Sequence, residues 1–306
     1  MTSIAVLGPG GVGGFLAGAL VRAGGDATAT VLAREPTAEL IERRGLEVQS
    51  VVLGDFLARP RATAILSTPV DVLLVATKAT GLVAALARVQ VEPGLVVPLL
   101  NGLDHMARLR EWFPARVAAG TIRIESDQPA PGRIVQTSPF LRVDLAADEE
   151  ALGPDVENLA TMLRRAGIPV EVGASEAQIL WSKLVRLNAL ACTTSAADRS
   201  IGFIRRDPEW REALRGCIDE AAAVASAEGA RIDPAQALAE LDAAHTELGS
   251  SMQRDIAAGR EPELDAIAGA VLRAAERHGL RCATVARLAV QIAERAGIGP
   301  PSAAVR

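Results

Sequence analysis

With 306 residues, 49% hydrophobic and 23% charged, the chain has the length of two domains and the composition of a globular protein with a sizeable core. The net charge of -5 and the few aromatic residues (three Trp, five Phe, no Tyr) argue against nucleic acid as a partner, because phosphate contacts and base stacking need basic and aromatic surfaces. We expect a cytoplasmic protein without membrane or metal, since no apolar run could cross a bilayer and the three cysteines and three histidines are scattered.

The first third of the chain alternates short apolar runs with helical patterns. Ile4–Leu7 is an apolar run that ends in glycines, as a buried parallel strand does, and a helix is predicted from Gly11 to Ala23. Such alternation builds a doubly wound parallel sheet, so we predict an α/β fold of the Rossmann type. The other elements predicted here are strands over 27–32, 71–76 and 95–100 and a helix over 82–89.

The middle of the chain changes character. Three further strands, joined by short Pro/Gly turns, are expected to add antiparallel edges to the sheet. The predicted elements are the strands 117–124, 132–137 and 141–145, a helix over 155–166 and a last strand over 169–172.

The remainder is predicted to be entirely helical. Ala- and Leu-rich amphipathic segments run from Ala174 to Ala296, with breaks expected at Gly202, 229–234, 259–262 and Gly279. We therefore place a boundary at residue 173, between a Rossmann-type domain (1–173) and an all-helical domain (174–306). The sequence leaves the oligomeric state open.

A glycine motif lies between the first strand and the first helix. The segment Gly8-Pro9-Gly10-Gly11-Val12-Gly13 is GxGxxG in the context that dinucleotide binding requires. Glycines permit a tight turn, close approach of a pyrophosphate and close helix–strand packing, and the helix N-terminus offers N–H groups to phosphate. The residues predicted to contact the cofactor here are Gly8, Gly10, Gly11, Val12 and Gly13.

Polar residues at three predicted strand ends extend this site. Arg34 ends the second strand where an NAD enzyme usually has an acid, and its guanidinium suits a ribose 2'-phosphate, so we predict NADPH as the cofactor despite the neighbouring Glu35. Lys78 and Asn101 follow the next two strands, at the carboxyl edge where open α/β sheets bind ligands. We expect Lys78 to reach a phosphate or carboxylate and Asn101 to contact the nicotinamide ribose or a substrate.

The helix predicted over 175–192 contains Leu180-Trp181-Ser182-Lys183-Leu184. Helical periodicity places Leu180, Leu184, Leu187 and Ala191 on one buried face, with Lys183 at its margin. A lysine at such a margin usually reaches water, so periodicity alone does not make it catalytic. Asn188 falls inside the apolar arc and needs a hydrogen-bond partner if it is buried.

Taken together, these motifs resemble the ketopantoate reductase family over nearly the whole chain. Besides the residues above, the resemblance rests on Thr77-Lys78, Leu100-Asn101-Gly102 and the stretch Ser250-Ser251-Met252-Gln253-Arg254-Asp255 with Gly259-Arg260 and Glu263. The resemblance implies reduction of a 2-oxo acid by NADPH, most directly 2-dehydropantoate to pantoate, with Lys183 as general acid. It further implies substrate contacts by Asn101, Ser251 and Asn188, and a place for Glu263 near the cofactor.

The sequence departs from the family pattern at three expected polar positions. Leu187 stands one turn after Lys183, where an asparagine is expected, and Leu248 stands three residues before Ser251. A second expected asparagine is missing from the stretch Ala189-Leu190-Ala191-Cys192. Two alternatives therefore stay open: a reductase acting on a more apolar 2-oxo acid, and a non-catalytic NADP(H)-binding regulator. Retention of Lys183, Ser251 and Glu263 argues against the regulator.

Overall fold

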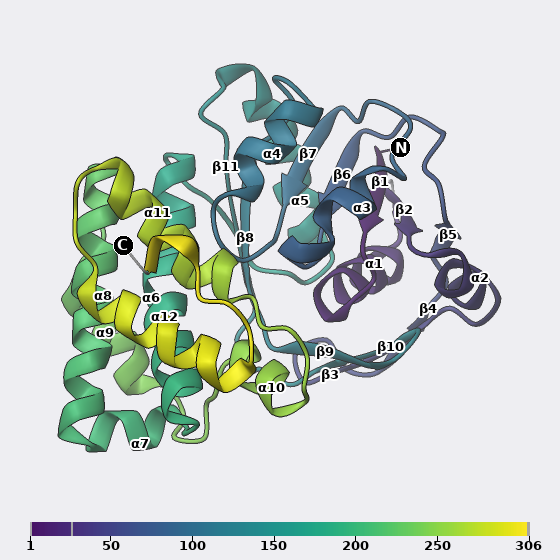
Figure 1. The fold of residues 1–306 in the computed structure, drawn as a ribbon. Coiled ribbons are helices and arrows are strands. Elements are labelled where there is room, and N and C mark those ends of the chain that lie inside the picture. The colour runs from purple at the N-terminus through teal and green to yellow at the C-terminus, as the bar shows by residue number, and fades with distance from the viewer. Residues whose placement is uncertain (1, 26, 305–306) are drawn as a thin grey trace. The chain divides into compact units, whose positions relative to one another are not determined.

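The computed structural model describes residues 2–25 and 27–304, which gather in two compact units (Figure 1). One unit consists of Met1–Leu100 and His105–Ile179, and the other of Asn101–Asp104 and Leu180–Arg306. The second unit thus includes a short segment, Asn101–Asp104, that the sequence assigned to the first. The domain boundary expected at residue 173 stays a prediction. Among the described residues, no helix is long and apolar enough to cross a membrane.

A parallel five-stranded sheet in the order β5-β2-β1-β6-β7 forms the centre of the first unit. The strands β1 (Thr2–Leu7) and β6 (Val72–Val75) pair in register from Ile4 and Val72, and their paired side chains are buried. Apolar residues on both faces are the composition of a parallel strand covered on both sides. The predicted Rossmann-type sheet is confirmed. Its remaining strands are β2 (Ala27–Leu32), β5 (Arg61–Thr63) and β7 (Leu95–Pro98).

Two smaller sheets accompany the central one. Strands predicted in the middle of the chain do form, but they lie in these sheets and not at the edges of the central sheet. The reason is pairing with segments that the apolar pattern did not reveal: β10 (Arg133–Gln136) pairs in parallel with the half-polar β3 (Leu46–Ser50). The two sheets are β4 (Phe56–Ala58)-β3-β10-β9 (Ser126–Ala130) and β12 (Val170–Val172)-β11 (Arg142–Ala146)-β8 (Ala119–Arg123).

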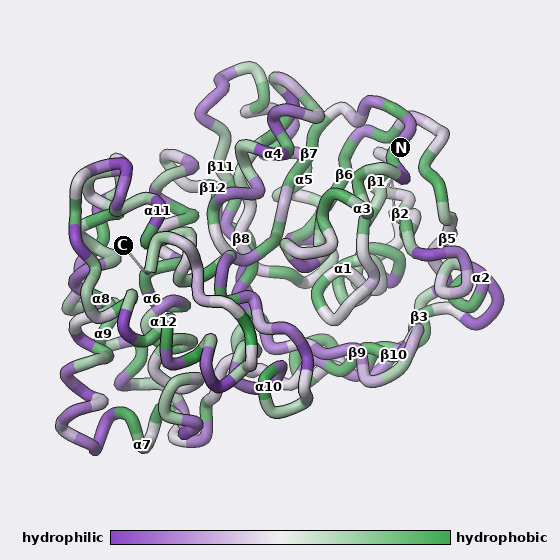
Figure 2. Tube along the Cα trace, in the orientation of Figure 1, coloured by the Kyte–Doolittle hydropathy of each residue, from purple (hydrophilic) through white to green (hydrophobic). Residues whose placement is uncertain are grey.

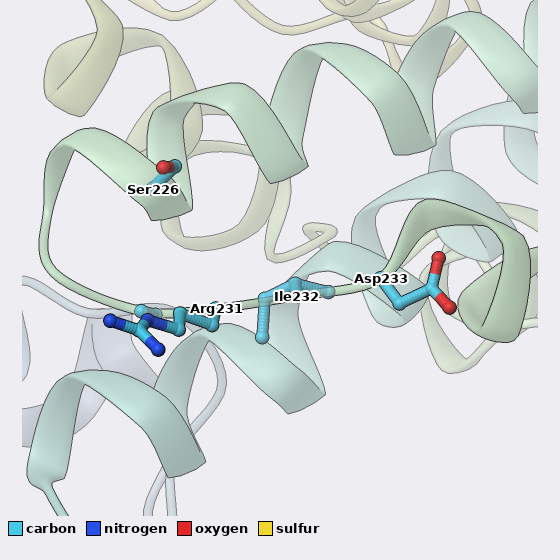
Figure 3. Close-up of a pocket in the computed structure, with 5 residues that line it drawn as sticks. Ser226, Arg231, Ile232 and Asp233 are labelled. Atoms are coloured by element: carbon cyan, nitrogen blue, oxygen red, sulfur yellow. The ribbon is translucent and has the colours of Figure 1, made fainter.

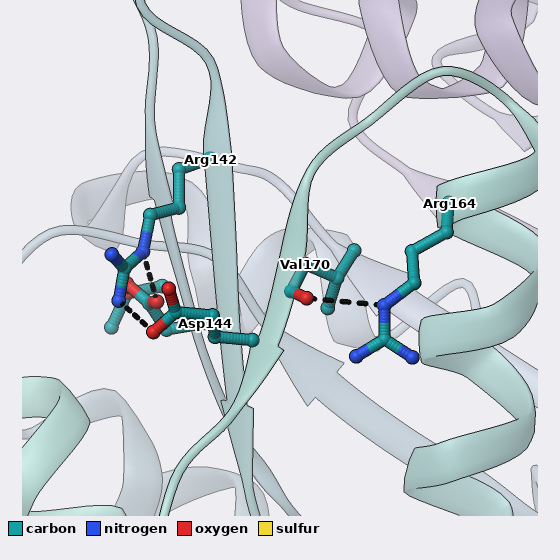
Figure 4. Close-up of polar contacts among 6 residues, drawn as sticks. Arg142, Asp144, Arg164 and Val170 are labelled. Carbon is teal, nitrogen blue, oxygen red and sulfur yellow. Dashed lines mark hydrogen bonds and ion pairs between the residues drawn. The ribbon is translucent and has the colours of Figure 1, made fainter.

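Two arginines stabilise the three-stranded sheet, one between its strands and one between the sheet and its flanking helix (Figure 4). Arg142 donates to Asp144 on its own strand and forms an ion pair with Glu171 on β12. Arg164, on α5 (Gly153–Arg165), donates from Nε to the carbonyl of Val170 at 3.1 Å. These contacts join α5 to β12 and, through Arg142, β12 to β11.

The helix α1 (Gly11–Ala23) lies between two sheets of this unit, with the bounds that the sequence predicts. Gly11, Gly14 and Gly18 share one face at helical spacing. A methyl group built at Gly14 would lie 2.4 Å from Ile134 Cδ1, and one at Gly18 would lie 2.8 Å from Val48 Cγ2. Because these residues have no side chain, the four-stranded sheet packs directly on the helix backbone. The unit's other helices are α2 (Glu35–Arg44), hydrophilic in Figure 2, and η1 (Ala79–Gly81), α3 (Leu82–Leu86), α4 (His105–Trp112) and η2 (Glu150–Leu152).

The described residues of the second unit form helices joined by loops and include no strand, as predicted. The break expected at Gly202 is wrong: Gly202 lies inside α7 (Ile201–Arg206), and the turn falls at Asp198, which has a positive φ of 54°. Gly202 is needed for close packing, since a methyl group there would lie 2.7 Å from the carbonyl oxygen of Thr246. The remaining helices are α6 (Glu176–Ala197, which begins in the first unit), α8 (Pro208–Ala227), α9 (Pro234–Ala243), α10 (Ser251–Ala257), η3 (Asp265–Gly269), α11 (Ala270–Arg277), α12 (Ala283–Ala296) and η4 (Ser302–Ala304).

Candidate active site

The glycine motif forms the turn between β1 and α1. Gly8 has a φ of +93°, a conformation that L side chains rarely adopt, and its N–H donates to the carbonyl of Leu32 at 3.0 Å. A methyl group at Gly13 would lie 2.1 Å from the carbonyl oxygen of Gly8. The first and last glycines are therefore required by the turn and by helix–strand packing.

Gly11 has a different role, which the motif alone does not suggest. A methyl group there would lie 2.0 Å from the carbonyl oxygen of Ser126 on β9. Ser126 Oγ also donates to the carbonyl of Gly11 at 2.8 Å, and Gln128 Nε2 donates to the carbonyl of Pro9. A strand more than a hundred residues away along the chain thus holds the glycine turn.

These two hydrogen bonds orient the peptides of the turn. In a trans peptide the carbonyl and the following N–H point in opposite directions, so the N–H groups of Gly10 and Val12 point away from β9. The first-turn amides of α1 have no intrahelical partner, and no side chain of the described residues caps them. A methyl group at Gly10 would meet no described atom within 4 Å. Open space beside outward N–H groups at a positive helix end suits the diphosphate of a dinucleotide.

The two predicted cations of this unit are both exposed at strand ends. Arg34 follows β2 and is the N-cap residue of α2, where its carbonyl accepts from Thr37 and Ala38 at 2.9 Å. Lys78 follows β6 and precedes η1. Both side chains have solvent access, as cofactor-binding cations need.

In the second unit, Asn101 meets Glu263. Asn101 Nδ2 donates to Glu263 Oε2 at 2.9 Å, across 162 positions of sequence. Because an ionised carboxylate can only accept, this bond turns the amide nitrogen of Asn101 toward Glu263 and leaves Oδ1 on the opposite side. Two residues predicted separately for the site are therefore in direct contact.

The face of α6 that carries Lys183 differs from the prediction. Trp181, Leu184 and Val185 are buried, whereas Leu180 and Leu187 are partly exposed together with Lys183. The buried arc is centred near Asn188, about a quarter of a turn from where the leucine spacing placed it. Lys183 and Leu187, one helical turn apart, consequently share a partly exposed face.

Asn188 is fully buried on the opposite side of this helix. The helix is unbroken from Glu176 to Ala197, so no distortion turns Asn188 toward Lys183. Its Oδ1 accepts the Cys192 thiol at 3.3 Å, and burial raises the pKa of that thiol to about 12. Asn188 Nδ2 has no hydrogen-bond partner among the residues that the structure describes.

The two serines at the start of α10 lie in different environments. Ser250 is buried and caps the helix by accepting from Gln253 N at 3.1 Å, and its hydroxyl also accepts from Thr194 Oγ1 at 3.0 Å. Ser251 is exposed in the first turn. Ser251 is therefore the serine with solvent access, while Ser250 joins α10 to α6.

A surface pocket at the α8–α9 connection contains none of the predicted site residues (Figure 3). Ser226, Ala230, Arg231, Ile232 and Asp233 line it. Asp233 accepts from Ala235 N at 2.9 Å and so caps α9. Across the described part of the chain, no group of three or more His, Cys, Asp or Glu is placed to hold a metal ion.

Comparison with known proteins identifies the family of this chain. The model of the family described as ketopantoate reductase PanE/ApbA matches residues 4–147, and the model of its C-terminal domain matches residues 177–296. The chain belongs to the ketopantoate reductase family. A 2-dehydropantoate 2-reductase of Mycobacterium tuberculosis is 34% identical over 285 residues, which cover 91% of this chain and 92% of the relative.

Solved ketopantoate reductases share the fold. The crystal structure of 2-dehydropantoate 2-reductase from Geobacter metallireducens superposes with a TM-score of 0.87 at 26% identity, covering 95% of this chain and 99% of the other. A ternary structure of D-mandelate dehydrogenase with NADH and anilino(oxo)acetate has the same fold, with a TM-score of 0.86 at 18% identity over 97% of this chain and 98% of that one.

Membership of the family confirms the resemblance drawn from the motifs. The chain is an oxidoreductase of a family whose members reduce a 2-oxo acid. The sequence did not single out Ser126, Gln128 or the contact between Asn101 and Glu263. A glycine at every third or fourth position of α1 was the one available sign that backbone packs there.

The glycine turn can be tested by two alanine variants. Gly11→Ala is expected to lower the thermal midpoint, because its methyl group meets β9; overpacking of this kind costs about 1–3 kcal/mol. Gly10→Ala is expected to change the midpoint little and to weaken cofactor binding, because its methyl group fills only open space. Thermal unfolding and a fluorescence titration with NADPH measure the two effects. Equal midpoints for both variants would contradict this assignment.

Proposed function

We propose that this enzyme reduces 2-dehydropantoate to pantoate with NADPH, a step of pantothenate biosynthesis. The observation that carries the proposal is the Asn101–Glu263 hydrogen bond in the same helical unit as Lys183, in a chain of this family. These residues supply an acceptor oriented by a carboxylate and a cation on a partly exposed helix face. A 2-oxo acid needs a proton donor at its carbonyl and polar contacts to its carboxylate, and both are available.

The residues proposed to hold NADPH are those that the sequence predicts for the cofactor. The outward amides of Gly10, Gly11, Val12 and Gly13 would bind the diphosphate, with Gly8 shaping the turn. Arg34 would pair with the 2'-phosphate and Lys78 with a phosphate oxygen. Asn101 and Glu263 would lie at the nicotinamide end. When bound, the reduced nicotinamide supplies a hydride.

Lys183 is the proposed general acid. Its ammonium would donate a hydrogen bond to the carbonyl oxygen of the substrate and stabilise the negative charge that develops there. The same group would then give its proton to the alkoxide as the 2-hydroxy acid forms. The exposed Ser251 and the Oδ1 of Asn101 would bind the carboxylate end or a distal hydroxyl. A role for Asn188 would depend on its Nδ2, the atom without a partner among the described residues.

A second candidate substrate is a more apolar 2-oxo acid. Leu187, one turn after Lys183, is partly exposed on the same helix face, where it would offer methyl groups and no hydrogen bonds to a substrate. Leu248 does not add to this case, because it is buried and its backbone carbonyl accepts from Ile201 N at 2.8 Å. Leu187 alone therefore favours the apolar alternative.

The substrate is decided by measuring NADPH oxidation with ketopantoate beside bulkier and more apolar 2-oxo acids. Ketopantoate is expected to give the highest kcat/KM. Turnover of another acid only would keep the chemistry and replace the substrate. NADPH binding without turnover of any acid would support the regulator and overturn the reductase. Leu187→Asn is the matched variant: it should raise the preference for ketopantoate if Leu187 contacts the substrate.

Loss of the proposed acid should affect chemistry and not cofactor binding. In Lys183→Ala and in Lys183→Met, which keeps the length of the stem, kcat is expected to fall by about 100-fold or more, the usual range for removal of a general acid. NADPH affinity should stay within about threefold, because Lys183 is proposed to contact the substrate and not the cofactor. A threefold change is well below the tenfold change that corresponds to about 1.4 kcal/mol. Near-normal turnover in either variant would remove Lys183 from this role.

Cofactor preference should depend on Arg34. In Arg34→Ala the ratio of NADPH to NADH affinity is expected to fall by about tenfold or more, since hydrogen bonds to charged groups contribute about 1.5–3 kcal/mol. NADH affinity should be unchanged because NADH has no 2'-phosphate. Arg43→Ala, an exposed arginine in the last turn of the same helix, is the control. An unchanged ratio in Arg34→Ala would rule out this assignment.

A further inference from the structure

The Asn101–Asp104 segment is held on the helical unit by a second contact beyond Asn101–Glu263. Arg273 on α11 bridges the segment and the start of its own helix. Its Nη2 lies 2.6 Å from Asp104 Oδ2, and its Nη1 lies 2.7 Å from Asp265 Oδ1. Nη2 also donates to the backbone carbonyl of Asp265 at 2.9 Å. One guanidinium therefore makes three hydrogen bonds, which a lysine could not reproduce in the same geometry.

The helix is shaped to receive the segment at this point. Asp265–Gly269 forms a π-helical turn at the start of α11, beginning two residues after Glu263, and such turns are frequent at functional sites. Gly102 has a φ of +85°, and a methyl group there would lie 2.0 Å from the carbonyl oxygen of Ala266 in that turn. The backbone of the segment thus packs directly on the π-helical turn.

Gly269 makes the arginine contact possible. A methyl group at Gly269 would lie 2.6 Å from Asp265 Oδ1 and 2.9 Å from Arg273 Nη1. Any larger residue would separate the two charged groups. Gly102 in the segment, and Gly269 and Arg273 on the helix, therefore together hold Asn101–Asp104 in place.

Folding stability is not the main effect of this ion pair. The side chains of Asp104 and Asp265 are 49% and 71% exposed, and exposed ion pairs contribute little to folding free energy. Arg273 is more covered, with 29% of its side chain exposed. Its contacts restrict where the segment can lie, and the segment begins with Asn101.

We propose that Arg273 is a positioning residue: through Asp104 it holds the Asn101–Asp104 segment on the π-helical turn, so that the Asn101 amide meets Glu263 within the unit that carries Lys183. This inference rests on the proposed function, because positioning matters only if Asn101 contacts the cofactor or substrate. It adds a residue, Arg273, that takes no part in the chemistry itself. Without it, Asn101 samples orientations in which Oδ1 is misplaced.

The test uses Arg273→Gln, Asp104→Asn and their double variant in the full chain. Each single variant is expected to lower kcat by about tenfold, a size typical of misplaced positioning groups, with less change in the KM for NADPH. The double variant should be no slower than the singles, because the two residues act through one contact. Arg211→Gln is the control: it removes a bidentate arginine–carboxylate pair with Asp242 elsewhere in the same unit and should leave kcat unchanged.

Amide hydrogen exchange of the 99–106 peptide tests, without any measurement of turnover, whether Arg273 and Asp104 hold the segment in place. Exchange should accelerate at least severalfold in Arg273→Gln and Asp104→Asn, and not in Arg211→Gln. If no 2-oxo acid is turned over by the native enzyme, the proposed function fails while hydrogen exchange still tests the fastening. The inference would be overturned if Arg273→Gln had the same exchange rate and the same kcat as Arg211→Gln.

Discussion

Direct packing of helix α1 between two sheets is the constraint on which the first unit depends. The glycine face at 11, 14 and 18 lets β9, β10 and β3 approach the helix backbone, and the other side of the helix covers the central parallel sheet. A side chain on the glycine face would push one sheet away. Since β9 also supplies the hydrogen bonds to the glycine turn, the packing that builds the core is the packing that shapes the cofactor end.

The glycine motif therefore combines structural and binding requirements in one short stretch. Gly8 and Gly13 are needed for the turn and for helix–strand contact, and Gly11 for contact with β9. Gly10 alone faces open space and is available for a ligand. A motif that is usually described by its ligand is, in this chain, mostly determined by its protein neighbours.

The second unit contains the proposed chemical groups together with a segment from outside its continuous chain. Lys183 and Ser251 lie on its helices, Glu263 lies just before the π-helical turn, and Asn101 belongs to the unit by contact although it follows β7 in sequence. Grouping the reacting residues in one unit means that their mutual distances do not depend on the other unit. The contacts of the Asn101–Asp104 segment with the π-helical turn and with Arg273 place Asn101 in this group.

The local sequence pattern was enough to predict the parallel sheet, the glycine turn, helix α1 and the helical second half. Strands buried on both faces give continuous apolar runs, and amphipathic helices give apolar residues at every third or fourth position. The residues proposed for the site could also be named from the sequence, because they stand at strand ends and within family signatures. Tertiary structure alone decided the separate sheets, the buried face of α6 and the placement of Asn101. Each of these depends on partners distant in sequence, such as Ser50 with Gln136, Thr194 with Ser250 and Asp104 with Arg273, and the local sequence pattern does not show which distant group will be met.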